Sequence, residues 1–426
     1  MLIFKLKLIV GTVAFVMLID GYLWLGIKRL LFKKSHKRQL LVKKIFWTIP
    51  WIFIAGSVCY LIVPQLESNT LFRNYFMATL ATVYFSKLIA LPFLFADDLR
   101  RMTIWSKRKI MRTAAPAAPA STQENPEHKI SRSKFITQAG IIAGGIPFIM
   151  LTKGMVKGAY DYKLRHETIY LPKLPDRFNG LKIVQISDIH SGSFFDKDAV
   201  KKGIDMIMQQ KADLIFFTGD MVNNKTDEVY EYTDIFGHIK APMGVFSTLG
   251  NHDYGDYVTT WTSTEEKAKN LADLCDVHKD LGWNLMRNQH EVISIHGQKL
   301  GLIGVENWGD RGRFQKFGDI TKAKLGMEET PVQLLLSHDP SHWDAIVRKE
   351  HSDIDVMFAG HTHGMQFGVE IGSFKWSPSQ YIYKQWAGMY TEGNQHLYVN
   401  RGFGFIGYPG RVGILPEITV FTLQKA

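Results

Sequence analysis

The sequence predicts an α/β domain built on a parallel sheet and preceded by an α-helical transmembrane region. Two observations carry this prediction. Long apolar runs and clusters of Lys and Arg dominate residues 1–160, whereas short apolar runs bounded by turn residues alternate with amphipathic stretches in residues 165–426. Such a change of pattern along one chain indicates two regions that fold in different solvents.

The amino-terminal region contains four long apolar runs, at residues 8–27, 45–63, 75–95 and 135–151. The first run approaches the roughly 20 residues that a helix needs to cross a bilayer, although Asp20 interrupts it. Buried helices of a soluble protein are the alternative, above all for the short, glycine-rich fourth run. Lys87 stands in the third run, and we interpret it as a side chain that reaches toward the membrane interface.

The basic residues between these runs predict how the chain crosses the membrane. Many Lys and Arg residues separate the first run from the second and the third from the fourth, whereas Arg73 stands alone between the second and the third. Basic loops stay in the cytoplasm, so four crossings predict a multi-pass integral membrane protein whose carboxyl-terminal domain is extracytoplasmic. If the fourth run does not cross, that domain faces the cytoplasm instead. The low-complexity stretch near residues 114–134 is predicted to be a linker.

Charge and cysteine content limit the possible partners. The net charge of +11 is a feature of nucleic-acid-binding proteins. Most of the excess, however, lies in the loops beside the predicted membrane helices, where topology and anionic lipids account for it. We therefore expect membrane contact and no nucleic-acid partner. The two cysteines, Cys59 and Cys275, stand in different regions, so we expect neither a disulfide nor a cysteine-rich metal site.

The carboxyl-terminal domain begins with alternating strands and helices and ends with consecutive strands. Crossover helices are predicted at residues 198–209, 227–239 and 264–281, and strands at 284–287, 292–295, 299–305, 395–402 and 415–423. Asp339 and Pro340 supply an N-cap and a first-turn proline for a further helix through Arg348.

Polar side chains stand at the carboxyl ends of five short apolar runs. They are Asp188 and His190, Asp220, Asn251 to Asp253, His338, and His361 with His363. Ligands of open α/β sheets gather at the carboxyl ends of the strands, so these side chains are expected to converge on one edge. A polar turn after a buried strand would explain any one of them alone.

The motifs Asp-x-His, Gly-Asp, Gly-Asn-His-Asp, a lone His and Gly-His-x-His, in this order, resemble those of the calcineurin-like metallophosphoesterases. With the apolar region in front, the chain resembles the membrane-associated branch of that family. The resemblance covers roughly residues 165–426 and implies a four-layer α/β/β/α sandwich around two metal ions. It implies that one ion is held by Asp188, His190, Asp220 and His363, and the other by Asp220, Asn251, His338 and His361.

These residue types also predict a chemistry of their own. Nitrogen and oxygen donors without sulfur suit Mn, Fe or Zn better than Cu(I), and the set holds too much imidazole for Mg or Ca. Two such divalent ions lower the pKa of a bridging water, which attacks phosphorus, and they clamp the phosphoryl oxygens. His252, oriented by Asp253, is the predicted proton donor to the departing oxygen.

Substrate contacts are predicted at three arginines, because a guanidinium group binds two phosphate oxygens at once. Arg311 lies in the loop Trp308 to Arg313, and Arg401 and Arg411 lie near the carboxyl terminus. A solvated loop is the alternative for each. The aromatic residues between Phe374 and Tyr390 are candidates for a lipid-receiving groove, and packing of an irregular insert is the alternative.

Together these patterns predict a membrane-anchored dimetal phosphoesterase. Its phosphorylated substrate would be a phosphate ester or pyrophosphate, and a lipid-linked one is favoured because the anchor keeps the enzyme near lipids. Two alternatives are a phosphodiesterase for a soluble substrate and a membrane receptor or scaffold that keeps the fold without hydrolysis. The intact set of Asp220, Asn251 and His252 argues against the receptor.

Overall fold

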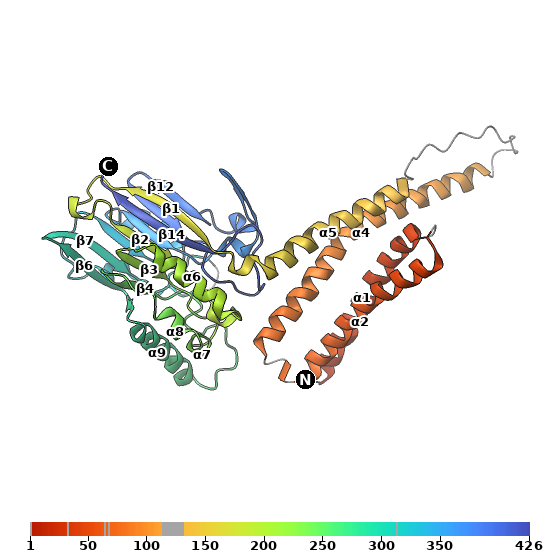
Figure 1. Cartoon of the computed structure of the whole chain (residues 1–426), viewed down its shortest axis with the longest axis horizontal. Coiled ribbons are helices and arrows are strands. Elements are labelled where there is room, and N and C mark those ends of the chain that lie inside the picture. The colour runs from red at the N-terminus through yellow and green to blue at the C-terminus, as the bar shows by residue number, and fades with distance from the viewer. Residues whose placement is uncertain (1, 32–33, 64, 67–68, 113–131, 312–313) are drawn as a thin grey trace. The chain divides into compact units, whose positions relative to one another are not determined.

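A computed structural model describes residues 2–31, 34–63, 65–66, 69–112, 132–311 and 314–426. The chain divides into two compact units, Met1–Thr152 and Lys153–Ala426 (Figure 1). Most of the predicted linker around residues 114–134 lies outside the described residues, as do Gly312 and Arg313 of the predicted substrate loop.

The amino-terminal unit is helical. Its helices are α1 (Leu2–Leu31), α2 (His36–Ile62), α4 (Thr70–Arg112) and α5 (Arg132–Val156), of which the last turn belongs to the second unit. All four are long and apolar enough to cross a membrane, so the four predicted runs are confirmed as candidate spans. Each helix extends beyond its apolar run because the polar flanks continue the helical hydrogen bonding, as in α4, which runs on to Arg112.

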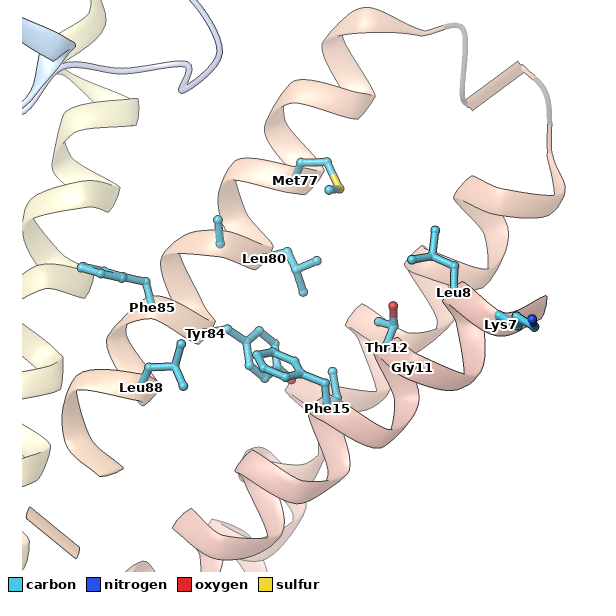
Figure 2. A pocket seen from close by; sticks show the side chains of 12 residues that line it. Lys7, Leu8, Gly11, Thr12, Phe15, Met77, Leu80, Tyr84, Phe85 and Leu88 are labelled. Carbon is cyan, nitrogen blue, oxygen red and sulfur yellow. The ribbon is translucent and has the colours of Figure 1, made fainter. Parts of the chain in front are cut away.

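Buried polar contacts join α1 and α4. Asp20 on α1 is fully buried, and Lys87 Nζ on α4 lies 2.6 Å from its Oδ1. Tyr84 donates a hydrogen bond of 2.8 Å to the other Asp20 oxygen. The interpretation of Lys87 as a side chain that reaches for the interface is therefore wrong, because an ion pair with Asp20 satisfies its charge within the helical unit. Side chains of α1 and α4 also line an apolar groove (Figure 2).

The second unit contains two six-stranded sheets. The first has the order β1 (Lys163–Tyr170), β14 (Glu417–Gln424), β2 (Lys182–Ile186), β3 (Leu214–Thr218), β4 (Val245–Thr248) and β5 (Asn284–Leu285). The second has the order β12 (Gly388–Glu392), β13 (Gln395–Val399), β9 (Val356–Ala359), β8 (Gln333–Leu336), β7 (Gln298–Gly304) and β6 (Gln289–Ile295). Strands β2 to β5 are parallel to one another, as are β7, β8, β9 and β13. The predicted parallel sheet is thus present twice.

Alternation of side chains along the central strands produces four layers. Phe216 of β3 belongs to a buried cluster with Leu334 of β8 and Phe358 of β9, which fills the space between the sheets. Ile215 and its alternate neighbour Phe217 point the other way, into a second cluster with helices α6 (Lys197–Gln209) and α9 (Thr264–Asp280). A third cluster covers the outer face of the second sheet with α10 (Ile320–Ala323) and the π-helix η4 (Trp343–Val347). The α/β/β/α architecture is confirmed.

Some elements differ from their predicted form. The helix predicted at residues 227–239 consists of two short helices, α7 (Asp227–Tyr230) and α8 (Thr233–Phe236). The break falls at Tyr232, whose φ of −120° accompanies burial of its ring in the core beneath the first sheet. The helix after Asp339 begins at Ser341, passes through η4 and continues as α11 (Arg348–Glu350). A hairpin of β10 (Val369–Ile371) and β11 (Phe374–Trp376) follows the last histidine motif.

Candidate metal centre

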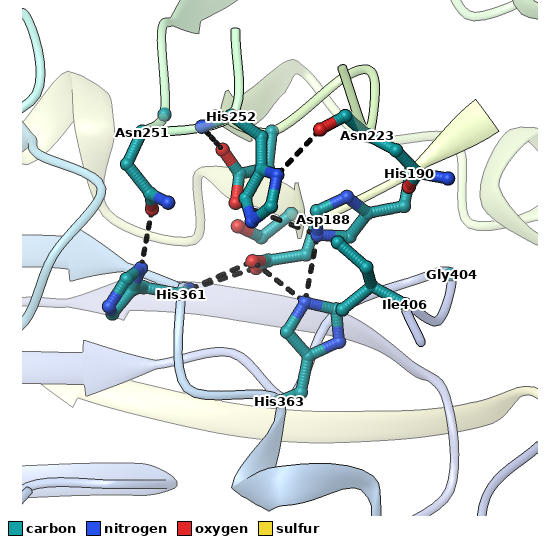
Figure 3. A network of polar contacts seen from close by, with 12 residues as sticks. Asp188, His190, Asn223, Asn251, His252, His361, His363, Gly404 and Ile406 are labelled. Atoms are coloured by element: carbon teal, nitrogen blue, oxygen red, sulfur yellow. Dashed lines mark hydrogen bonds and ion pairs between the residues drawn. The ribbon is translucent and has the colours of Figure 1, made fainter. Parts of the chain in front are cut away.

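The carboxyl ends of five parallel strands meet at one place in the second unit. Asp188 and His190 follow β2, Asp220 follows β3, and Asn251 follows β4, all in the first sheet. His338 follows β8, and His361 and His363 follow β9, in the second sheet. All seven side chains are buried or nearly so, and even that of His361 is only 9% exposed. The structure brings together the whole set of predicted ligand residues. Figure 3 labels five of them: Asp188, His190, Asn251, His361 and His363.

One cluster forms around Asp188, His190 and His363. The Nε2 atoms of His190 and His363 face each other at 3.0 Å, and His363 Nε2 lies 3.2 Å from Asp188 Oδ1. Asp220 Oδ2 lies 3.5 Å from His190 Nε2. Nitrogen and oxygen atoms thus point at one common centre.

A second cluster forms around Asp220, His338 and His361. His338 Nε2 lies 3.2 Å from Asp220 Oδ2 and 3.2 Å from Asn251 Oδ1. His361 Nδ1 lies 2.7 Å from the same Asn251 oxygen. Asp220 Oδ2 is therefore within reach of both clusters.

The tautomers of two histidines show that these clusters fit cations. His190 Nδ1 lies 3.2 Å from Val222 O, and His338 Nδ1 lies 2.7 Å from Thr218 O. A carbonyl oxygen only accepts, so each Nδ1 carries a hydrogen, and Nε2 is the ring nitrogen that faces the cluster. His338 Nε2 then faces two acceptor oxygens, an arrangement that needs a positive charge between them. Metal-bound histidines typically donate their second N–H in this way.

The electrostatics of the site also favour a cation. Burial alone would raise the pKa of Asp220, but His338 and His252 hold that pKa well below its ordinary value. Burial alone would lower the pKa of His338, yet Asp220 raises it to about 10. Burial lowers the pKa of His190 well below its usual value. The shared carboxylate therefore stays charged and draws positive charge toward the His338 nitrogen.

The backbone of the site is strained. Five of the predicted ligand residues adopt a left-handed conformation: Asp188 (φ 52°), His190 (φ 50°), Asp220 (φ 61°), His361 (φ 71°) and His363 (φ 49°). Each such residue costs on the order of 1–3 kcal/mol and persists only where its surroundings fix it. Backbone hydrogen bonds between the loops do so, such as His190 N to Asp220 O at 3.1 Å. Strain of this kind gathers at functional sites.

Two motif glycines are required by close packing of these loops. A Cβ on Gly360 would lie 2.3 Å from Asp188 Oδ2, and a Cβ on Gly250 would lie 2.2 Å from Asp220 Oδ1. No other residue type fits at these positions without moving a carboxylate of the cluster.

The predicted proton donor lies beside the clusters, but its orienting partner differs from the prediction. His252 Nδ1 lies 2.6 Å from Asn223 O, and its ring packs on Tyr257 at a centroid distance of 4.3 Å. The Asp253 carboxylate, predicted to orient His252, instead accepts hydrogen bonds from the backbone N–H groups of Asp220, Met221 and Gly250. With Val222 N as a fourth donor, the Asp253 carboxylate therefore fixes the loop that carries Asp220.

The three predicted substrate arginines lie in different surroundings. Arg401 is buried and pairs with Glu417 at 2.5 Å and Glu370 at 2.6 Å. Arg411 is buried behind His363, with Nη2 at 3.0 Å from His363 Nδ1. Arg311 is exposed, and its guanidinium carbon lies 5.9 Å from the centroid of the Tyr383 ring. Contact of any of them with substrate stays a prediction.

Residues without a motif complete the surroundings of the clusters. Asn251 Nδ2 donates to Tyr257 OH at 2.7 Å, which leaves its amide oxygen, Oδ1, directed toward the histidines. His361 Nε2 lies 2.7 Å from Tyr383 OH and 3.6 Å from Asp339 Oδ2. At the start of the following helix, Asp339 accepts a hydrogen bond from Ser341 N through Oδ1, as predicted for an N-cap, and this leaves Oδ2 to face His361. Nothing in the spacing of the sequence indicated that Tyr257 and Tyr383 contact residues of the clusters. The position of Asp339 directly after His338 could have indicated that it lies near them.

Comparison with known proteins gives matches to both units. A family model described as calcineurin-like phosphoesterase matches residues 181–365. A second, described as probable calcineurin-like phosphoesterase, transmembrane domain, matches residues 6–159.

Individual relatives match at moderate identity. The chain is 30% identical over 317 residues to the uncharacterized metallophosphoesterase YkuE of Bacillus subtilis, covering 70% of this chain and 99% of the relative. It is 26% identical over 313 residues to a transmembrane protein with metallophosphoesterase domain of Danio rerio, covering 72% and 67%. It is 27% identical over 281 residues to the UDP-2,3-diacylglucosamine pyrophosphatase LpxG of Chlamydia trachomatis, covering 55% and 81%. Among solved structures, NAD nucleotidase of Haemophilus influenzae matches with a TM-score of 0.36 at 17% identity, covering 53% and 45%.

Proposed function

The chain belongs to the calcineurin-like metallophosphoesterases, and we propose that it is a multi-pass membrane enzyme that hydrolyses a lipid-linked phosphate ester or pyrophosphate with two divalent cations. One observation carries the proposal: Asp220 Oδ2 lies 3.5 Å from His190 Nε2 and 3.2 Å from His338 Nε2. One carboxylate oxygen can therefore serve both clusters. Two cations about 3.5–4 Å apart are the arrangement used by two-metal phosphoesterases.

The two donor sets follow from the geometry of the clusters. Asp188, His190 and His363 would hold one cation, and Asn251, His338 and His361 the other, with Asp220 shared. Imidazole, carboxylate and amide donors without sulfur favour Mn, Fe or Zn. When bound, such ions supply an activated water and neutralise the phosphoryl oxygens.

His252 is the group that gives a proton to the departing oxygen. Its Nδ1–H donates to Asn223 O, and its backbone N–H donates to Asp220 Oδ1 at 2.8 Å, so both the ring and the backbone are held. The Nδ1 contact leaves Nε2 as the nitrogen that carries the transferable proton. General acid catalysis of this kind contributes about 10²–10⁴ to the rate.

Arg311 is the substrate-binding arginine that the geometry favours. It is exposed and lies over the Tyr383 ring, whose hydroxyl contacts His361. A guanidinium held beside Tyr383 can bind two oxygens of a phosphate or pyrophosphate group. Arg401 and Arg411 already have protein partners, which makes them weaker candidates.

The membrane helices support a lipid-linked substrate. An enzyme anchored by four spans meets phosphorylated lipids at high local concentration, and the relative LpxG is named as a pyrophosphatase of a diacylated nucleotide sugar. The distribution of basic residues supports an extracytoplasmic catalytic domain. A reporter fused after Ala426 tests that placement, and a cytoplasmic signal would refute it.

The proposed activity is tested on the full-length protein purified in detergent. Hydrolysis of a lipid monophosphate, a lipid pyrophosphate and bis(p-nitrophenyl) phosphate is compared, with and without a chelator. The remote binding energy of the lipid should raise kcat/KM at least about tenfold over that of the soluble diester. A preference for the soluble diester would identify a soluble phosphodiesterase activity instead. Two bound metals without any hydrolysis would identify a receptor.

A further inference from the structure

An apolar groove lies between α1 and α4 of the helical unit (Figure 2). Its volume is about 580 Å³, within the range of roughly 300–1,000 Å³ that is typical of ligand pockets. Leu8 and Phe15 of α1 line one wall, and Leu80 and Phe85 of α4 line the other. Among the described residues around it, Lys7 alone carries a charge.

The end of the groove toward the middle of the two helices lies at Phe15 and Val16 on α1 and at Tyr84 and Leu88 on α4. Phe15 packs on Tyr84 with ring centroids 5.8 Å apart, and Tyr84 is hydrogen-bonded to the buried Asp20. Val16, which also lines the groove, is fully buried. From this level the groove extends toward the amino-terminal parts of α1 and α4, where Lys7 and Met77 lie. It therefore has an apolar interior and a cationic rim.

We propose that this groove binds one acyl chain of an anionic phospholipid whose phosphate contacts Lys7. Both helices are long and apolar enough to span a bilayer, so the medium around the groove is hydrocarbon and the available apolar ligand is a lipid chain. Lys7 stands in the second turn of α1, at the amino-terminal end of the candidate span Leu6–Leu31, where a crossing helix meets the lipid headgroups. A lysine ammonium binds phosphate as a point charge and adds affinity for anionic lipids.

Helix directions assign the groove to a particular leaflet. Asp20 pairs with Lys87 and Arg29 with Asp98, so α1 and α4 run parallel. Ser133 at the start of α5 donates a hydrogen bond to Asp97 of α4. Gly144, further along α5, lies against Ser86, which comes earlier in α4. The two helices therefore run antiparallel.

With four crossings, the amino-terminal parts of α1 and α4 reach the membrane face from which α5 leads into the catalytic domain. The bound lipid therefore belongs to the leaflet on that face, whichever way the whole protein is oriented.

The full-length protein in nanodiscs tests this proposal with a phosphatidylglycerol that carries a photoreactive diazirine in its acyl chain. The expected result is that cross-links map to peptides containing Leu8, Phe15 and Leu80. Gly11→Leu and Ala81→Leu should fill the groove from either helix and abolish these cross-links. A Cβ on Gly11 meets nothing within 4 Å, so the added side chain enters open space. Gly21→Leu on the same helix is the matched control, because a Cβ there also meets nothing within 4 Å.

Charge is tested separately. Lys7→Gln should reduce labelling by phosphatidylglycerol about fivefold relative to a zwitterionic analogue, whereas Lys28→Gln at the other end of α1 should leave it unchanged. Cross-links spread evenly over all the helices, or unchanged in both groove-filling variants, would overturn the site. Equal labelling by both lipids, insensitive to Lys7→Gln, would overturn the headgroup contact. Because the readout is binding, it is independent of whether the enzyme hydrolyses lipids.

Discussion

Replacing Asp220 with Asn removes the charge that both clusters share while keeping the size of the side chain. Oδ1 can still accept from His252 N. An NH2 group replaces Oδ2, which lies 3.5 Å from His190 Nε2 and 3.2 Å from His338 Nε2. Loss of an interaction that supports a bound metal costs about 10–100-fold in affinity or activity. Because both cations lose a partner, the combined loss should be about 10²–10⁴-fold.

The assay for Asp220→Asn measures metal content by mass spectrometry and kcat on the best substrate, at saturating metal. Asp205→Asn, on the exposed face of α6, is the matched control and should behave as the wild type. His190→Ala should lose more of one metal than of the other, since His190 belongs to one cluster only. Full activity with two metals in Asp220→Asn would refute the shared-carboxylate reasoning.

Three further predictions concern single side chains. His252→Gln should keep both metals but lower kcat for an alkyl ester about 10²–10⁴-fold. For a p-nitrophenyl ester, whose leaving group needs no proton, the loss of kcat should be much smaller. Equal losses for the two esters would contradict the role of His252 as the general acid. Arg401→Gln should destabilise the fold by about 3–5 kcal/mol, because it removes the buried partner of Glu417 and leaves the partly exposed Arg165, at 3.2 Å, as its cationic partner. Glu417→Gln in the same chain should recover part of the melting temperature. A raised KM with unchanged stability would point to substrate contact instead. Burial lowers the pKa of His278 to about 3 in the folded chain, whereas in the unfolded chain it is about 6.5. As pH falls from about 6.5 toward 3, the unfolded chain therefore binds a proton that the folded chain does not. The free energy of unfolding should decrease over this range by up to about 1.4 kcal/mol per pH unit. His278→Phe should flatten that part of the pH profile of the melting temperature, and an unchanged profile would exclude His278 as its source.

The fold and the convergence of the site were predictable because both follow from local patterns. An apolar run of four or five residues that ends in Asp, Asn or His marks both a buried strand and its functional edge, as in β4 with Asn251. The membrane helices were equally visible, because a bilayer demands about 20 apolar residues in succession.

Tertiary partners were not predictable from the same patterns. Asp253 stands next to His252 in the sequence, yet the turn directs its carboxylate to four backbone N–H groups, and a carbonyl 29 residues earlier orients the histidine. Lys87 looked like a residue for the membrane interface because its partner, Asp20, lies 67 residues away. Long-range pairing of this kind leaves no periodic trace in a single sequence.

The most direct test of the dimetal centre is a crystal structure of the metal-loaded enzyme with anomalous scattering recorded at the metal edges. Two anomalous peaks on either side of Asp220 Oδ2 are expected, one against His190 and His363 and the other against His338 and His361. A single peak, or two peaks that do not share Asp220, would contradict the proposed centre.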